Sequence, residues 1–340
     1  MSKTYHYLAS ANTGIGFVDN FSSILEPDKK GFTYILKGGP GTGKSTMLKK
    51  IGKYFENLGE DVEYFHCSSD FNSLDGVKIV GCNISIIDGT SPHSKDTTLP
   101  MINDKIIDLS DSFNYSIQQH ENKIKSLVEK KQLQYKIIYK YLSSLKAIED
   151  VNLELTKSLF DKVEFDKYYS CFVSKLNLRF QNKKSNVRKL FLDYFDDKNI
   201  NSINRFNEYS NVIEINRDDF FNLKMLNNLS DLAINFGYNI IQFFNTITND
   251  ISALYIKEID TFIYLNNNYE KLELNNKKLI KNIKTNILLK NKLINKISYN
   301  LNIAINYHKN IEKYYVKAVN FNKINILTDN LINLIKNKLN

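Results

Sequence analysis

The sequence predicts an α/β fold that carries long helices. A glycine-rich loop lies between a strand-like apolar run and a helical run, and two more short apolar runs follow within the first 90 residues. Residues that form turns then become rare: all four prolines lie in the first 100 residues, and twelve of the 13 glycines lie at or before Gly89. Because glycine and proline punctuate turns, we expect long helices beyond residue 100.

The glycine-rich loop has the sequence GGPGTGKST and follows the apolar run at residues 32–36. Its spacing fits the pattern GxxxxGK[ST], in which backbone N–H groups and a helix N-terminus face phosphate oxygens. Lys44 is expected to reach the outer phosphates, and Ser45 to ligate Mg²⁺, which prefers oxygen ligands. The predicted nucleotide-binding residues are Gly38, Gly39, Pro40, Gly41, Thr42, Gly43, Lys44, Ser45 and Thr46.

A second acidic site is expected at Asp88, which ends the short apolar run at residues 83–88 in the Walker B manner. Such an acid at the carboxyl end of a strand lies where open α/β sheets bind ligands, so Asp88 would hold Mg²⁺ directly or through water. The alternative is that it only caps the strand. Gly89 and Thr90 follow, so the adjacent glutamate that activates water in many ATPases is absent.

Two loops at strand ends offer further candidates for orienting water or a substrate hydroxyl, and both are expected to face the γ-phosphate. Asp70 and Asp75 belong to the first loop, and His93 to the second. The plainer alternative is that the two aspartates form Asx turns and that the histidine has no special role. A metal site is not expected, because no zinc pattern fits the spacing of His66, Cys67, Cys82 and His93.

The composition limits the number of domains and the classes of partner that the chain can have. A chain of 340 residues with 42% hydrophobic content can hold two domains, and its three cysteines give no disulfide framework. No apolar run is long enough to cross a membrane and no signal segment is visible, so we expect a cytoplasmic protein with no membrane partner. The net charge of +9 is compatible with nucleic-acid binding, although the lysines are scattered among Asn and Ile. A homo-oligomer is also open.

Apolar residues recur at helical spacing over residues 106–159, which predicts two long antiparallel helices, and again over residues 272–339. Lys290 interrupts the second apolar stripe. Each region would form a helical hairpin on its own domain, or alternatively a coiled coil with a partner.

The segment between these regions can be aligned with the first half by placing Gly237 opposite Gly59. Strands at residues 212–215, 239–244 and 261–265 and a helix at 223–236 then match, but residues 216–222 (NRDDFFN) replace the glycine loop. The second half is either a decayed duplicate or a chance match. The predicted domains are a P-loop NTPase core of three layers (1–102), a helical hairpin (103–180), a degenerate P-loop-like α/β half (181–268) and a C-terminal helical hairpin (269–340).

The segments LKGGPGTGKSTMLKKIG, VEYFHCSSDFNSLDGV and IIDGTSPH resemble a family of bacterial tandem P-loop ATPases common in clostridia. The resemblance implies an ATP site at residues 38–46 with Asp88 as the Walker B acid. His66, Cys67, Asp70, Asp75 and His93 fall in other motifs of that family. Because the second loop here lacks glycine, the resemblance implies one active site per chain.

The first 178 residues contain no arginine, so a catalytic arginine would have to come from elsewhere. The hypothesis is that the second half packs against the first and brings one of its arginines, or a lysine, near the γ-phosphate. The arginines of the chain are Arg179, Arg188, Arg205 and Arg217.

Together these features predict a Mg²⁺-dependent ATPase, or a switch in which the nucleotide moves the helices. One alternative is a small-molecule or nucleoside kinase in which Asp70, Asp75 or His93 receives the acceptor. Another is a nucleotide-sensing scaffold for nucleic acid or a protein. ATP is preferred over GTP only through the resemblance, since no guanine-reading motif stands after the third strand.

Overall fold

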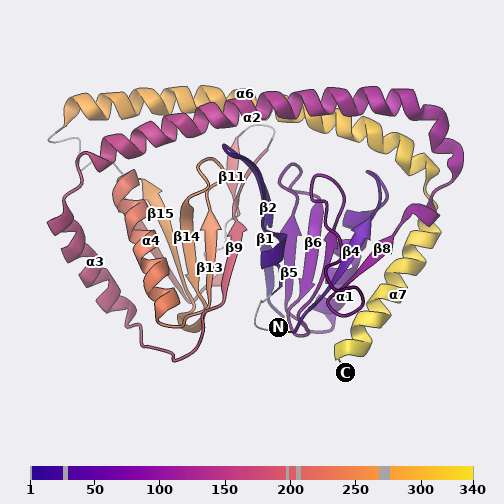
Figure 1. Cartoon of the computed structure of the whole chain (residues 1–340), viewed down its shortest axis with the longest axis horizontal. Helices are drawn as coiled ribbons and strands as arrows, with labels where there is room; N and C mark the ends of the chain where they lie inside the picture. The colour runs from indigo at the N-terminus through magenta and orange to yellow at the C-terminus, as the bar shows by residue number, and fades with distance from the viewer. Residues whose placement is uncertain (1, 26–29, 197–198, 204–207, 268–275, 340) are drawn as a thin grey trace.

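A computed structural model describes residues 2–25, 30–196, 199–203, 208–267 and 276–339. The chain forms two α/β halves side by side, with two long helices lying across both of them (Figure 1). No helix in these ranges combines the length and the apolar character that crossing a membrane requires.

The first half contains a six-stranded sheet in the order β1-β5-β6-β7-β4-β8. Strand β6 is antiparallel to both of its neighbours, and the other pairs are parallel. Helix α1 (Lys44–Asn57) connects β4 to β5. The strands are β1 (Thr4–Tyr7), β4 (Phe32–Lys37), β5 (Val62–His66), β6 (Leu74–Ile79), β7 (Ile84–Asp88) and β8 (Asp104–Asp108).

The second half contains a five-stranded sheet in the order β12-β15-β14-β13-β9. Read from β9, its strands have the same order and relative directions as β1, β5, β6, β7 and β4 of the first half. Helix α4 (Asp219–Asn235) corresponds to α1. The strands are β9 (Val187–Phe191), β12 (Asn211–Arg217), β13 (Ile240–Phe244), β14 (Ile251–Ile256) and β15 (Thr261–Asn267).

The two helices also end in the same way. Gly59 and Gly237 both adopt left-handed backbone conformations, with φ of 90° and 85°. The amide after each glycine donates back to a carbonyl five residues earlier, from Glu60 to Phe55 and from Tyr238 to Ala233. This is the expected glycine cap, and it confirms the register that places the two glycines opposite each other.

The two sheets share one apolar core. Side chains alternate along each strand, so one face carries Ile35 and Phe65 while the other faces α1. The shared core also contains Ile241 and Phe243 of β13. Each sheet therefore has helices on its outer face only, and the other sheet covers its inner face. This differs from the predicted three-layer core, because each half has a single crossover helix, which leaves one face free.

The long helices pack against each other rather than forming separate hairpins. Helix α2 spans Glu121–Lys157 and α6 spans Lys277–Ala318, and they run antiparallel. Asn286 donates from its amide to the Asn152 side chain, and Lys290 forms an ion pair with Glu149. The prediction of two helices over residues 106–159 was wrong, since β8 and one uninterrupted helix occupy most of that range. Leu272, at which the second helical region was expected to begin, lies outside the described residues.

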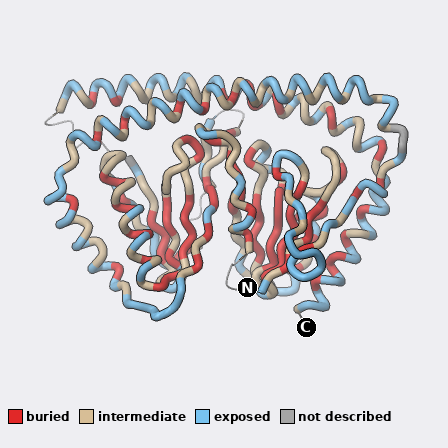
Figure 2. The backbone as a smooth tube through the Cα atoms, viewed as in Figure 1, coloured by how far each residue is buried: buried red, intermediate tan, exposed pale blue. Residues whose placement is uncertain are grey.

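Each long helix leads into a shorter helix that completes the core of the other half. Helix α3 (Lys162–Leu176) follows α2 and buries Phe165 against α4, whereas α7 (Phe321–Leu339) follows α6 and buries Leu331 and Ile335 against α1. Buried residues accordingly lie on the inward sides of α3, α4 and α7 and along both sheets (Figure 2). The expectation of a hairpin packed on its own domain was therefore wrong.

The remaining elements of the described ranges are two hairpins and four short 3₁₀ helices. Strands β2 and β3 form one hairpin, and β10 and β11 form the other. These elements are β2 (Ser10–Thr13), β3 (Gly16–Asp19), β10 (Asp193–Phe195), β11 (Ile200–Ser202), η1 (Phe21–Ser23), η2 (Ser110–Ser112), η3 (Tyr115–His120) and η5 (Lys257–Ile259).

A buried ion pair joins the two halves. The guanidinium of Arg188 in β9 donates to both carboxylate oxygens of Glu63 in β5, at 2.8 and 2.7 Å. It also donates to the carbonyl oxygens of Ser23 and Ile24. Bidentate geometry with further hydrogen bonds is what allows such charges to be buried.

Replacing Arg188 with alanine should remove the bidentate partner of the buried Glu63 carboxylate and leave the Lys78 amine, 3.8 Å from Glu63 Oε2, as a weaker one. We expect the free energy of unfolding to fall by about 3–5 kcal/mol, measured by denaturant unfolding. Lys189→Ala is the matched control, because its side chain is exposed on the same strand, and it should change stability by no more than about 0.5 kcal/mol. Equal effects of the two substitutions would argue against the ion pair as a link between the halves.

Candidate functional site

The glycine loop joins β4 to α1 with the geometry that its sequence predicts. Gly41 and Gly43 have φ of 68° and 85°, a region that favours glycine. Gly43 immediately precedes the first turn of α1. The Thr42 hydroxyl donates to the Gly39 carbonyl oxygen at 2.9 Å and closes the loop. The backbone is thus curved around the start of the helix, as a phosphate-binding loop requires.

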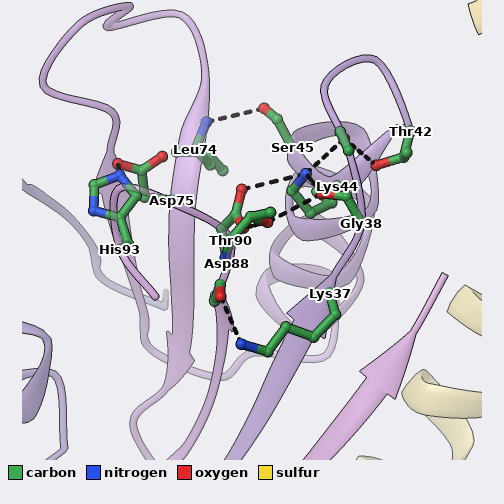
Figure 3. A network of polar contacts seen from close by, with 12 residues as sticks. Lys37, Gly38, Thr42, Lys44, Ser45, Leu74, Asp75, Asp88, Thr90 and His93 are labelled. Atoms are coloured by element: carbon green, nitrogen blue, oxygen red, sulfur yellow. Dashed lines mark hydrogen bonds and ion pairs between the residues drawn. The ribbon is translucent and has the colours of Figure 1, made fainter. Parts of the chain in front are cut away.

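Lys44 lies folded along this loop beside Asp88. Its Nζ donates to the carbonyl oxygens of Gly38 and Gly39 at 2.7 and 2.8 Å and lies 3.5 Å from Asp88 Oδ2. The two side chains are only 11% and 17% exposed. Figure 3 shows the amine between the loop and the carboxylate. A cation and an acid therefore share one partly buried site at the carboxyl ends of β4 and β7.

The segment after Asp88 is tied to the loop. The Thr90 amide donates to Asp88 Oδ1 at 2.8 Å, and the Thr90 hydroxyl lies within hydrogen-bonding distance of that oxygen and of the Gly38 carbonyl. The Lys37 amine donates to the Gly89 carbonyl oxygen at 2.8 Å. These contacts fix the orientation of the Asp88 carboxylate toward Lys44.

Ser45 connects the loop to β6. Its Oγ accepts a hydrogen bond from the Leu74 amide at 2.9 Å (Figure 3). A hydroxyl oxygen has two lone pairs, so one remains for a cation. Ser45 and Asp88 thus supply oxygen ligands that fit Mg²⁺, with phosphate oxygens and water completing the set. Among the described residues no group of three or more His, Cys, Asp and Glu side chains could hold a metal ion.

Asp75 and His93 form a buried pair on the other side of β6. His93 Nε2 lies 3.2 Å from Asp75 Oδ2, and the imidazole stacks on Phe21. Burial disfavours the charged imidazole, but the carboxylates of Asp75, Asp88 and Asp19 outweigh it and raise the pKa of His93. The pair points away from Ser45 (Figure 3), so the expectation that both loops face the γ-phosphate was wrong for these two side chains. Side chains alternate along a strand, so Asp75 takes the opposite face.

The remaining candidates lie at the end of β5 and in the turn that follows it. Asp70 is exposed, and its Oδ1 accepts from the Asn72 amide at 3.1 Å, which is the Asx turn that the plainer alternative predicts. His66 contacts the Phe71 carbonyl oxygen and the His6 ring, and burial lowers its pKa to about 4. Burial also raises the pKa of the Cys67 thiol, so it is not activated.

Helix α6 lies directly on the glycine loop, which the sequence did not reveal. A methyl group added at Gly39 would lie 2.5 Å from the Tyr315 ring, and one at Gly41 would lie 3.0 Å from the Glu312 carbonyl oxygen. The loop glycines are therefore needed for packing as well as for curvature. Since these helix residues lie more than 200 positions away along the chain, no local pattern could have indicated them.

The corresponding turn in the second half lacks a cradle. Asp218 caps α4 by accepting the Phe221 amide at 3.0 Å, and Asn222 donates to the Arg217 carbonyl oxygen. This is an ordinary side-chain helix cap. An acidic side chain stands where a phosphate would have to approach, so the turn does not fit a nucleotide.

Two of the described arginines have other side-chain partners than a phosphate. The guanidinium of Arg188 is committed to Glu63, and that of Arg217 pairs with Glu164 at 2.6 Å. Arg205 lies outside the described residues. The arginine form of the hypothesis is thus unsupported for Arg188 and Arg217, and its lysine form stays open.

A model of the KAP family P-loop domain matches residues 15–325, which covers both halves and the long helices. The chain belongs to the KAP family of P-loop NTPases. Comparison with curated proteins and with solved structures found no match. Membership of the KAP family supports nucleotide binding at the glycine loop, and the matched range treats the two halves as one unit.

The Asp75–His93 pair should make stability depend on pH. Because the folded pKa of His93 is raised, its contribution is complete below the unfolded value of about 6.5 and is lost as pH rises through the folded value. His93→Gln should therefore cost most stability in acid and progressively less in alkali, measured by denaturant unfolding across pH. Asp75→Asn should remove the same pH dependence. A cost that does not vary with pH would be inconsistent with the pairing.

Proposed function

We propose that this KAP family protein binds and hydrolyses ATP with Mg²⁺ at one site per chain, formed by residues 38–46 and Asp88. The observation that carries the proposal is the position of Lys44, enclosed by loop carbonyls and 3.5 Å from Asp88. An amine in this position, at the end of a glycine loop and the start of a helix, is what the outer phosphates of a nucleotide require.

Each residue then has a defined role. The amides of the loop and of the first turn of α1 bind the phosphate oxygens, and Lys44 binds the outer phosphates. Ser45 and Asp88 hold the cation, and Thr90 orients the carboxylate. Bound Mg²⁺ would neutralise charge on the phosphates. Asp70, Asp75 and His93 stay candidates for water or substrate positioning, although Asp75 and His93 face away from Ser45.

We further propose that the nucleotide acts as a switch on the long helices. Ser45 is bonded to Leu74, and the turn before Leu74 reaches α2 through a hydrogen bond between Ser69 and Tyr135 at 2.9 Å. Tyr315 and Glu312 of α6 pack on the loop itself. A shift of the loop or of Ser45 on nucleotide binding would thus change the contacts of both long helices.

The second half serves as a scaffold in this proposal. Its matching strand order and helix caps favour an origin by duplication, and its turn after β12 has lost the glycines. Its task would be mechanical: it supplies α6, which covers the glycine loop, and α7, which completes the core around α1.

Lys44→Ala tests the proposal. Losing charged hydrogen bonds worth about 1.5–3 kcal/mol should weaken ATP binding by about 10- to 150-fold and bring phosphate release to background. Binding would be measured by calorimetry, and release in the presence of Mg²⁺ with and without DNA or RNA. Lys53→Ala is the control, because Lys53 is exposed on the same helix and pairs only locally with Glu56; it should behave as the parent protein.

Phosphate release by Lys44→Ala at the parent rate would overturn the hydrolase proposal. Transfer of labelled phosphate to an acceptor in a metabolite extract, with little free phosphate, would instead indicate the kinase alternative.

A further inference from the structure

One face of α2 is directed at the loops around the nucleotide site. Lys131, Tyr135 and Tyr139 are spaced four residues apart and so lie on the same side of the helix. Tyr135 donates from its hydroxyl to Ser69 Oγ at 2.9 Å, and Tyr139 to Asn12 Oδ1 at 2.7 Å. Ser69 lies in the turn after β5, and Asn12 lies in β2, so both partners belong to the first half. Lys131 is the next member of this face toward the end of the helix that lies over the glycine loop.

One face of α6 meets the same region from the other side. His308, Glu312 and Tyr315 follow each other at helical spacing, and Glu312 and Tyr315 contact the positions of Gly41 and Gly39. His308 therefore lies one turn from residues that touch the phosphate-binding loop. The two faces converge above that loop.

The convergence produces a chain of three polar side chains. Lys131 Nζ lies 3.5 Å from His308 Nδ1, and His308 Nε2 lies 3.5 Å from Glu312 Oε1. Burial, together with the charges of Lys131 and Lys44, lowers the pKa of His308 to about 4, so the imidazole is neutral at pH 7. A neutral ring with its proton on Nε2 donates to Glu312 and accepts from Lys131. The histidine thus orients the amine.

The charged and polar groups of Lys131, His308 and Glu312 interact electrostatically with the nucleotide site. Lys44 and Asp70 both influence His308 and Glu312 electrostatically, so the cluster lies in the field of the P-loop lysine. Burial lowers the pKa of Lys131 and raises that of Glu312. A half-buried ammonium group held by contacts of 3.5 Å would gain a much stronger partner if a phosphate lay nearby.

We propose that Lys131 contacts the γ-phosphate of the nucleotide bound at residues 38–46, with His308 and Glu312 as positioning residues. The proposal rests on the proposed nucleotide site and extends it to a residue of α2. Lys131 would then act as an arginine finger does in other P-loop proteins. It would supply a second cation, beside Lys44, to a first half that contains no arginine.

Lys131 would act by charge alone. In hydrolysis a bond forms between water oxygen and the γ-phosphorus, and the bond to the oxygen that bridges to the β-phosphate breaks. The proton of the attacking water passes to the released phosphate or to solvent. Lys131 forms no covalent bond and stabilises the negative charge on the γ-phosphate oxygens. The same contact would distinguish a bound triphosphate from a diphosphate.

The test compares binding of ADP and of a non-hydrolysable ATP analogue to the full chain by calorimetry. Lys131→Ala should weaken analogue binding by about tenfold or more and ADP binding by less than about threefold, since only the γ-phosphate contact is lost. Lys131→Arg should retain the preference for the triphosphate. Lys130→Ala, at an exposed neighbouring position, should leave both affinities unchanged.

His308 is tested by conservative rescue. His308→Asn offers an amide oxygen to Lys131 and should keep much of the triphosphate preference, whereas His308→Ala should lose part of it. If Lys131→Ala does not fold, as judged by circular dichroism, Lys131→Met replaces it because it retains the apolar stem.

An unchanged ratio of the two affinities in a folded Lys131 variant would overturn the assignment of Lys131 and leave the nucleotide site intact. Failure of the parent protein to bind either nucleotide would instead overturn the proposed function, and this inference with it.

Discussion

The antiparallel packing of α2 against α6 is the interaction on which the rest of the structure depends. Contacts between Asn152 and Asn286, Glu149 and Lys290, and Lys131 and His308 follow one register along the pair. Each helix arises from one half and leads into a short helix that is buried against the other half. Separating the long helices would therefore expose apolar surface in both halves, so the chain behaves as one mechanical unit.

The same packing determines what surrounds the nucleotide site. Helix α6 can approach the glycine loop so closely because Gly39 and Gly41 have no side chains. Loop curvature, phosphate access and helix packing are thus satisfied by the same residues. A ligand that changes the conformation of the loop must also change the contacts that Tyr315 and Glu312 make with it, unless the ligand fits without disturbing them. These contacts would be the physical basis of the proposed switch, in which nucleotide binding changes the position of the helices that span both halves.

Local signals in the sequence were sufficient to place the loop, its strand and Asp88 at the end of the next predicted strand but one. They were also sufficient for β12, β13 and β15, since hydrophobic runs and the cap at Gly237 depend on neighbours in the chain, but not for β9 and β14. Local signals did not predict the features that depend on packing between residues far apart in the sequence. The periodicity of residues 106–159 identified a helix but not its partner, and Arg188 was bound by Glu63 rather than directed at the phosphates. Lys131, His308 and Glu312 carry no motif, and only the fold brings them to the loop.

The central claim is that two similar halves maintain one nucleotide site. It is tested most directly by the number of Mg–ATP analogue molecules bound per chain, measured by calorimetry with protein of known concentration. The account predicts one, because the turn after β12 has Asp218 as a helix cap where the first half has a glycine loop. A stoichiometry of two would show that the second half also binds nucleotide, and the absence of binding would show that the glycine loop is not a nucleotide site.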